Sequence, residues 1–108
     1  MEEQQLGQTR PADTNNHSIY SPSAGETTVV STIIICNTSG SAVTYRIFVD
    51  DDGSTYDQDT ALFYGISLDA NTTDILQTHI GMDDSNGNLA VRSSSANALT
   101  FTVHGSVI

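Results

Sequence analysis

Residues 27–49 read TTVVSTIIICNTSGSAVTYRIFV. The first part, residues 27–37, is rich in β-branched side chains and is apolar on both faces near its end, which predicts a central strand covered on both sides. Residues 43–49 alternate with the two-residue period of a strand. One face of this second strand carries Val43, Tyr45, Ile47 and Val49. Because only a short turn containing Gly40 separates the two runs, we expect them to form a β-hairpin.

The rest of the chain repeats this pattern of short apolar runs interrupted by Gly, Asn, Asp and Ser. The pattern predicts further strands at residues 18–20, 62–68, 73–79, 89–93 and 98–104. By the two-residue period, one face of the second of these runs carries Leu62, Tyr64, Ile66 and Leu68. Such a series of roughly seven or eight short strands is typical of an antiparallel β-sandwich of jelly-roll or Greek-key type. We therefore predict an all-β, single-domain protein.

Residues 1–16 have a different composition, with Gln, Asn, Pro and charged residues and one large apolar side chain, Leu6. They show neither helical nor strand periodicity. A polar segment with a single large apolar residue buries too little surface to order itself. We therefore expect a flexible or extended N-terminal arm over residues 1–16 and a β-sandwich domain over residues 17–108. The arm is expected to become ordered on a neighbouring subunit, with Leu6 in an apolar groove.

The charge of the chain excludes some classes of partner. Thirteen acidic residues stand against three arginines and no lysine, which gives a formal net charge of −10. Nucleic-acid binding depends on clustered Lys and Arg, so we expect no nucleic-acid partner. The sequence also lacks the ~20 consecutive apolar residues of a membrane helix and the basic and apolar regions of a signal peptide, so we expect no membrane partner.

Residues that support catalysis are not grouped along the sequence. His17, His79 and His104 lie in different predicted elements, and the Gly-x-Ser-x-Gly motif of hydrolases is absent. Cys36, the single cysteine, follows three isoleucines and has no basic neighbour, so we interpret it as a buried, unreactive side chain. The sequence predicts no enzyme activity, no catalytic residue and no cofactor.

The acidic segment at residues 50–59 carries candidate ligands for a calcium ion. Its weak candidate ligands for Ca²⁺ are Asp50, Asp52, Asp57 and Asp59. The segment lacks the Glu that closes an EF-hand loop, and Asp-rich turns between strands are common, so we predict a turn and no metal site. Asn37 and Asn71 begin glycosylation acceptor patterns, but we interpret both as turn residues whose side chains bond nearby backbone.

Several segments, in a fixed order, carry a family resemblance. They are SIY at 18–20, VVSTIIICNTSGSA at 29–42, TYRI at 44–47, ISLDANTT at 66–73 and FTVHGSVI at 101–108. Together they resemble small structural proteins in the virions of tailed phages, including marine and cyanobacterial ones. The resemblance spans residues 18–108 and consists of packing and turn patterns.

The resemblance implies a non-enzymatic virion protein. The most specific form is a capsid cement or decoration subunit, a homotrimer on the capsid exterior that stabilises the shell through the major capsid protein. The alternative is a tail-associated structural protein or a carbohydrate- or receptor-binding module. A carbohydrate site usually stacks sugars on exposed aromatic rings, and this chain has no Trp.

The predicted strands carry more apolar side chains than one small core requires, so some of them are expected to form an interface between subunits. The candidate interface residues are Leu6, Val43, Tyr45, Ile47, Leu62 and Tyr64. The sequence alone does not decide which of these belong to the core and which to the interface.

Overall fold

The computed structural model describes residues 3–50, 56–84 and 87–108. In these residues it contains eight strands, and no helix long and apolar enough to cross a membrane. The strands are β1 (Gln4–Thr9), β2 (His17–Tyr20), β3 (Thr27–Asn37), β4 (Val43–Asp50), β5 (Ala61–Leu68), β6 (Thr73–Asp83), β7 (Asn88–Ser93) and β8 (Leu99–Val107). Seven of them, β2 to β8, cover the runs that the sequence predicts.

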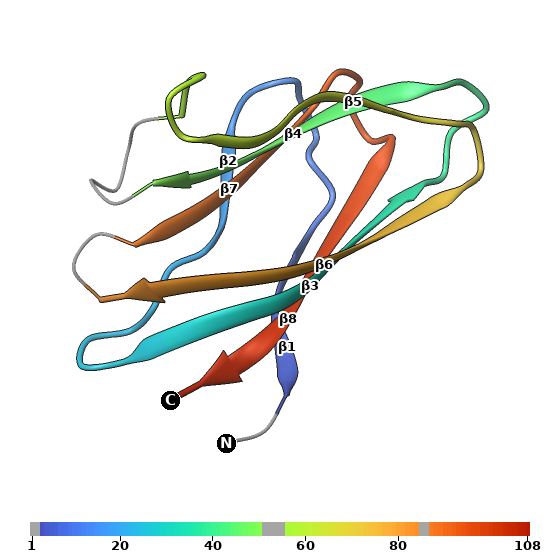
Figure 1. The fold of residues 1–108 in the computed structure, drawn as a ribbon. Coiled ribbons are helices and arrows are strands. Elements are labelled where there is room, and N and C mark those ends of the chain that lie inside the picture. The colour runs from blue at the N-terminus through green and yellow to red at the C-terminus, as the bar shows by residue number, and fades with distance from the viewer. Residues whose placement is uncertain (1–2, 51–55, 85–86) are drawn as a thin grey trace.

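The eight strands form two antiparallel sheets that pack face to face (Figure 1). The first sheet has the order β1-β8-β3-β6, and the second has the order β2-β7-β4-β5. Strand β1 pairs with β8, β2 with β7, β3 with β6 and β4 with β5, so the chain is one long antiparallel ribbon wrapped across two layers. This nesting is the jelly roll, which confirms the predicted all-β sandwich.

The predicted hairpin between residues 27–37 and 43–49 is wrong. Strand β3 pairs with β6 and β8 in the first sheet, whereas β4 pairs with β5 and β7 in the second. The connection therefore crosses between layers. Asn37 supports this crossing because its side-chain amide donates to the carbonyls of Ser41, Leu68 and Asp69 at 2.9, 3.0 and 3.1 Å. A short Gly-containing turn indicates a change of direction, but it does not distinguish pairing in one sheet from a step to the other.

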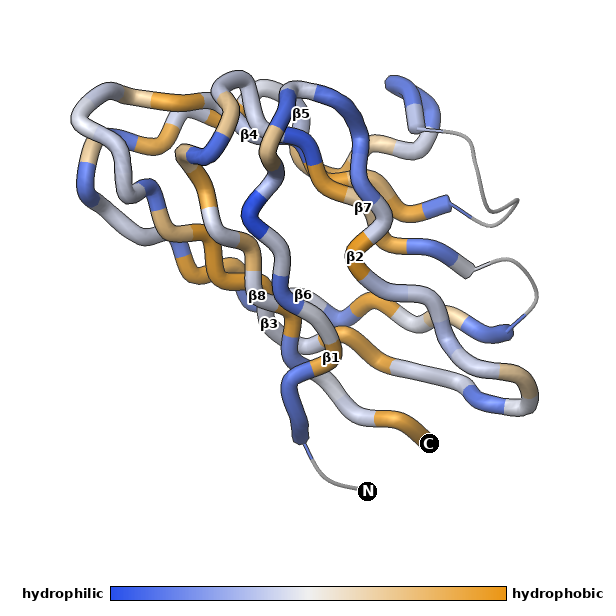
Figure 2. The backbone as a smooth tube through the Cα atoms, turned by 180° about the vertical axis from the view of Figure 1, so that it is seen from behind, coloured by the Kyte–Doolittle hydropathy of each residue, from blue (hydrophilic) through white to orange (hydrophobic). Residues whose placement is uncertain are grey.

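The core lies between the sheets and is built from alternating residues of the four central strands, β3, β4, β7 and β8. Its fully buried large side chains include Val30, Ile33, Ile35, Tyr45, Ile47, Leu89, Val91, Leu99, Phe101 and Val103. Figure 2 shows hydrophobic residues gathered along these strands, whereas hydrophilic residues occupy much of the connections. Burial of alternating apolar residues is the main stabilising contribution that a sandwich of this size has available.

The segment expected as an arm contributes a strand to the sandwich. Within it, β1 is hydrogen-bonded along β8, from the pair Gln4 and Gly105 to the pair Thr9 and Phe101. Leu6 packs against the core of its own chain. The segment is therefore extended, one of the two expected forms, but in this structure it belongs to the domain. The physical reason is that backbone pairing along β8 supplies the order that its side chains alone cannot supply.

Candidate assembly surface

Strand β5 forms one edge of the second sheet and exposes apolar side chains along its length. Leu62, Tyr64 and Ile66 are 49%, 43% and 39% exposed. The strand reads ALFYGISL and has no charged residue. Exposed edge strands are normally protected from pairing with other chains by charged side chains or by Pro, and β5 has neither. An apolar, uncharged edge of this kind is typical of a surface that a partner covers.

A bulge in β5 decides which way Tyr64 and Ile66 face. Ile66 lies opposite Tyr45 on β4, and Tyr64 lies opposite Arg46, so Gly65 is an extra residue without a partner on β4. Gly65 has a φ of 72°, a left-handed conformation that favours glycine. Because Tyr45 and Arg46 point to opposite faces of β4, the bulge places Tyr64 and Ile66 on different faces. The prediction that both share one face is therefore wrong.

Tyr64 is held in place on the outer face of the second sheet. The ring of the buried Phe48 contacts Tyr64 edge-on, with centroids 6.4 Å apart, and also contacts Tyr56 at 6.1 Å. The guanidinium carbon of Arg46 lies 4.0 Å from the centroid of the Tyr64 ring, a cation–π contact. These neighbours fix an exposed aromatic ring before any partner arrives, which lowers the entropy that binding would cost.

The structure separates the six candidate interface residues into three groups. Leu6 is half-buried and packs against the core of its own chain. Val43, Tyr45 and Ile47 are 3%, 1% and 0% exposed and belong to the core of the single chain, so they offer no surface to a partner. Leu62 and Tyr64 are exposed. Ile66 is exposed as well, but it was not among the candidate interface residues. The available signal was Gly65 before it, because Gly inside a strand run often marks a bulge.

Tyr45 also links the two sheets across the core. Its hydroxyl donates to Oδ2 of Asp74 on β6 at 2.9 Å, and its ring packs edge-on against Phe101 with centroids 6.3 Å apart. Burial, together with the nearby Asp74 carboxylate, raises the pKa of the Tyr45 hydroxyl above its usual range. Tyr45 is therefore a structural residue of the interior that stays protonated.

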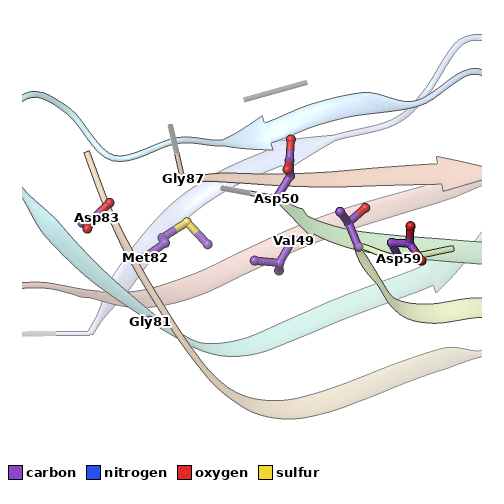
Figure 3. A pocket seen from close by; sticks show the side chains of 8 residues that line it. Val49, Asp50, Asp59, Gly81, Met82, Asp83 and Gly87 are labelled. Carbon is purple, nitrogen blue, oxygen red and sulfur yellow. The ribbon is translucent and has the colours of Figure 1, made fainter. Parts of the chain in front are cut away.

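Three acidic residues, Asp50, Asp59 and Asp83, line a hollow at one end of the sandwich (Figure 3). Its lining residues are Val49, Asp50, Asp59, Thr60, Gly81, Met82, Asp83 and Gly87. Figure 3 shows the carboxylates of Asp50, Asp59 and Asp83 on separate sides of it. Within residues 3–50, 56–84 and 87–108, no three His, Cys, Asp or Glu residues are grouped so that they could hold a metal ion. Asp52 lies outside the described residues, so the predicted absence of a metal site stays a prediction.

Asp57 takes part in a turn of the kind expected for this segment. Its Oδ1 accepts a hydrogen bond from the backbone N–H of Asp59 at 2.9 Å. The Asp57 backbone carbonyl also accepts from the N–H of Thr60 at 3.2 Å. Asx turns of this kind account for Asp at such positions without a metal ion.

The remaining sequence candidates do not converge. His17 lies on β2 in the second sheet, whereas His79 and His104 lie on β6 and β8 in the first. Cys36 is half-buried, so the interpretation as a buried side chain is wrong, because this residue lies on the outer side of β3. The interpretation of Asn37 as a turn residue is confirmed by its three bonds to backbone carbonyls.

No protein-family model matches this chain, and no curated protein matches its sequence. Among solved structures, the chain is similar to part of a chain in the structure of infectious bursal disease virus Gt strain, at 12% identity and a TM-score of 0.45, over 99% of this chain and 30% of that one. A chain in the structure of the Gx strain gives 10% identity and a TM-score of 0.42, over 98% of this chain and 28% of that one. This protein therefore spans less than one third of the chains it matches. We draw nothing about function from overlaps at this identity and TM-score.

Proposed function

We propose that this protein is a non-enzymatic structural subunit of a phage virion that stabilises the capsid shell by protein–protein contacts, as a cement or decoration protein does. The observation that supports assembly is the exposed, uncharged and apolar edge strand β5. The assignment to a virion rests on the sequence resemblance over residues 18–108. The partners are further copies of this chain and the major capsid protein.

The proposed contact between copies is a homotrimer interface centred on β5. Leu62, Tyr64 and Ile66 each have roughly half of their surface left to bury, which is worth about 1 kcal/mol per side chain. The edge also presents backbone groups that a neighbouring chain can pair with. A head-to-tail contact of this kind closes into a ring when the rotation between copies is three-fold. Each trimer would then contain the contact three times.

The trimer is tested by sedimentation of the full chain and of two matched variants. Leu62→Ser replaces the most exposed of the three apolar side chains of the proposed interface with a polar one and should raise the dissociation constant of the trimer by about tenfold or more. Ile75→Ser is the control, because Ile75 is 64% exposed on β6, at the edge of the other sheet. It should leave the association unchanged. A wild-type protein that stays a folded monomer at all concentrations would contradict the trimer.

The virion role is tested separately by counting the protein in purified particles. A cement protein should be present in several hundred copies spread over the shell. A few copies at one vertex would instead support the tail-associated alternative. Absence from particles whose other structural proteins are intact would exclude both.

A further inference from the structure

Strands β4 and β7 place two of the chain's three arginines directly opposite each other. Arg46 on β4 and Arg92 on β7 are Cα partners in the ladder, and both are half-buried. Like charges at directly opposed positions destabilise a sheet. A guanidinium group does not relieve this repulsion by losing its proton, because its pKa lies above ~12. The pair therefore retains a local positive charge in a chain whose net charge is −10.

The two arginines form no ion pair with the carboxylates of the described residues. In the part of the chain that the structure describes, neither arginine has a carboxylate oxygen within 4.0 Å. The guanidinium group of Arg46 instead lies over the ring of Tyr64. By contrast, the third arginine, Arg10, donates to the backbone carbonyl of Asn97. Within the described residues, the two opposed guanidinium groups therefore have no carboxylate partner.

A hollow beside the pair has the lining that an oxyanion requires. It is formed by Thr14, Thr44, Arg46, Arg92 and Ser94, and no acidic side chain lines it. The backbone N–H of Thr44 donates to the Ser94 hydroxyl oxygen at 3.0 Å, which leaves the hydroxyl proton of Ser94 available to donate. Two guanidinium groups and neighbouring hydroxyls supply several donors in a small space.

A second hollow beside the same pair has a different lining. Besides the two arginines, it is formed by Tyr56, Asp57, Gln58, Asp59 and Tyr64. The acidic side chains there disfavour an anion, whereas the hydroxyl-lined hollow has no acidic side chain.

We propose that Arg46, Arg92, Thr44 and Ser94 form a binding site for one oxyanion, a carboxylate or phosphate group, on the outer face of the second sheet. The anion would lie between the two guanidinium groups and offset the repulsion between them. The site uses central strands of one chain and requires no oligomer, so it goes beyond the proposed assembly through β5. A free ion and a carboxylate on a partner chain share this chemistry.

The site is tested by NMR titration of the full chain at constant ionic strength. One titration uses inorganic phosphate and a second uses a capped peptide with one Glu. We expect saturable shifts of the amide signals of Thr44, Arg92 and Ser94 with at least one probe, and the tighter probe identifies the source of the anion. Arg46→Gln and Arg92→Gln should each weaken binding by about tenfold or more.

The matched control is Arg10→Gln, which removes the same charge at a different place. It should bind the anion as the wild type does. Equal weakening by Arg10→Gln, or the absence of saturable shifts with both probes, would overturn the proposal. Loss of folding is checked with Arg92→Gln, which removes the repulsion and leaves the contact between Arg46 and Tyr64 in place. Its thermal midpoint without anion should be equal to or above the wild-type value. Phosphate or peptide should raise the midpoint of the wild type and of Arg10→Gln only.

Discussion

Strands β1 and β5 are both edge strands, β1 in the first sheet and β5 in the second. Their side chains differ in the contacts that they make. Side-chain hydrogen bonds connect β1 and the residue before it, Glu3, to neighbouring strands of the sheet. The Glu3 carboxylate accepts from the hydroxyls of Ser31 and Ser106, at 3.0 and 3.2 Å, and Gln8 donates to the hydroxyl of Thr102 at 3.0 Å. These side-chain hydrogen bonds attach β1 and Glu3 to β8 and β3 of the same sheet.

The large exposed side chains of β5 form no side-chain hydrogen bond of this kind. Leu62 and Ile66 are exposed and have no group that can form a hydrogen bond. Tyr64 is fixed by ring contacts that leave it partly exposed. The difference teaches that exposure of an edge is not by itself a sign of a binding surface. A binding surface is indicated by an exposed edge strand that has neither charged residues nor side-chain hydrogen bonds to its own sheet.

Removing β1 is the change with the largest expected effect. Deletion of residues 1–9 takes away the half-buried Leu6 and leaves β8 without one of its two neighbours. We expect a loss of about 2 kcal/mol or more from Leu6 alone. The thermal midpoint, followed by circular dichroism, should fall by about 10 °C or more.

The result of this deletion also decides the role of the N-terminal segment. An unchanged midpoint, combined with weaker retention on particles, would support an arm that works on a neighbouring subunit. A large fall in the midpoint would support β1 as a permanent strand of its own sandwich.

Two glycines test the two edges with one kind of substitution. A Cβ on Gly7 of β1 would lie 2.5 Å from the backbone oxygen of Ile19, so Gly7→Ala should cost about 1–3 kcal/mol through overpacking. A Cβ on Gly65 would meet nothing within 4 Å, so Gly65→Ala should cost only the backbone strain at φ 72°, roughly 1 kcal/mol.

These values are measured by urea unfolding, with Gly40→Ala as the control. Gly40 has an ordinary φ and open space around it, so its replacement should be close to neutral. A Gly65→Ala variant as stable as the Gly40→Ala variant would show that the β5 bulge is not a fixed feature of the edge.

The positions of seven strands could be predicted because side-chain periodicity and turn residues are local features of the sequence. In β8, Leu99, Phe101 and Val103 alternate with Thr100 and Thr102, and the structure buries the first three. Strand β1 could not be found in this way. It reads QQLGQT, and it is ordered mainly by backbone bonds to β8, nearly one hundred residues later in the chain. Backbone bonds of this kind leave no pattern in the side chains.

The candidate surface was predictable only in part, because it depends on register. The sequence identified Leu62 and Tyr64, but it did not separate them from Tyr45 and Ile47, which the opposite sheet covers. The opposition of Arg46 and Arg92 was not visible either. It requires knowing that β4 pairs with β7, whereas the turn after β3 suggested pairing with β3.

The smallest expected effect concerns Asp13, in the connection that leads from β1 to β2. The Asp13 carboxylate accepts from the backbone N–H of Asn15 at 2.9 Å and lies 2.6 Å from Nε2 of His17. These contacts, the Asn15 bond first, hold the pKa of Asp13 below its usual value of 3.8. A carboxyl whose pKa is lower in the folded state stabilises the fold above its unfolded pKa, and this contribution is lost as the pH falls through the folded pKa.

Asp13→Asn keeps an acceptor for Asn15 but removes the charge, so its thermal midpoint should lie slightly below that of the wild type at pH 7. The gap should be smaller than for either glycine variant, because Asp13 is exposed. Thermal scans between pH 7 and pH 2.5 should show the gap closing below about pH 4. A gap that persists unchanged at the lowest pH would show that Asp13 acts through its shape and not through its charge.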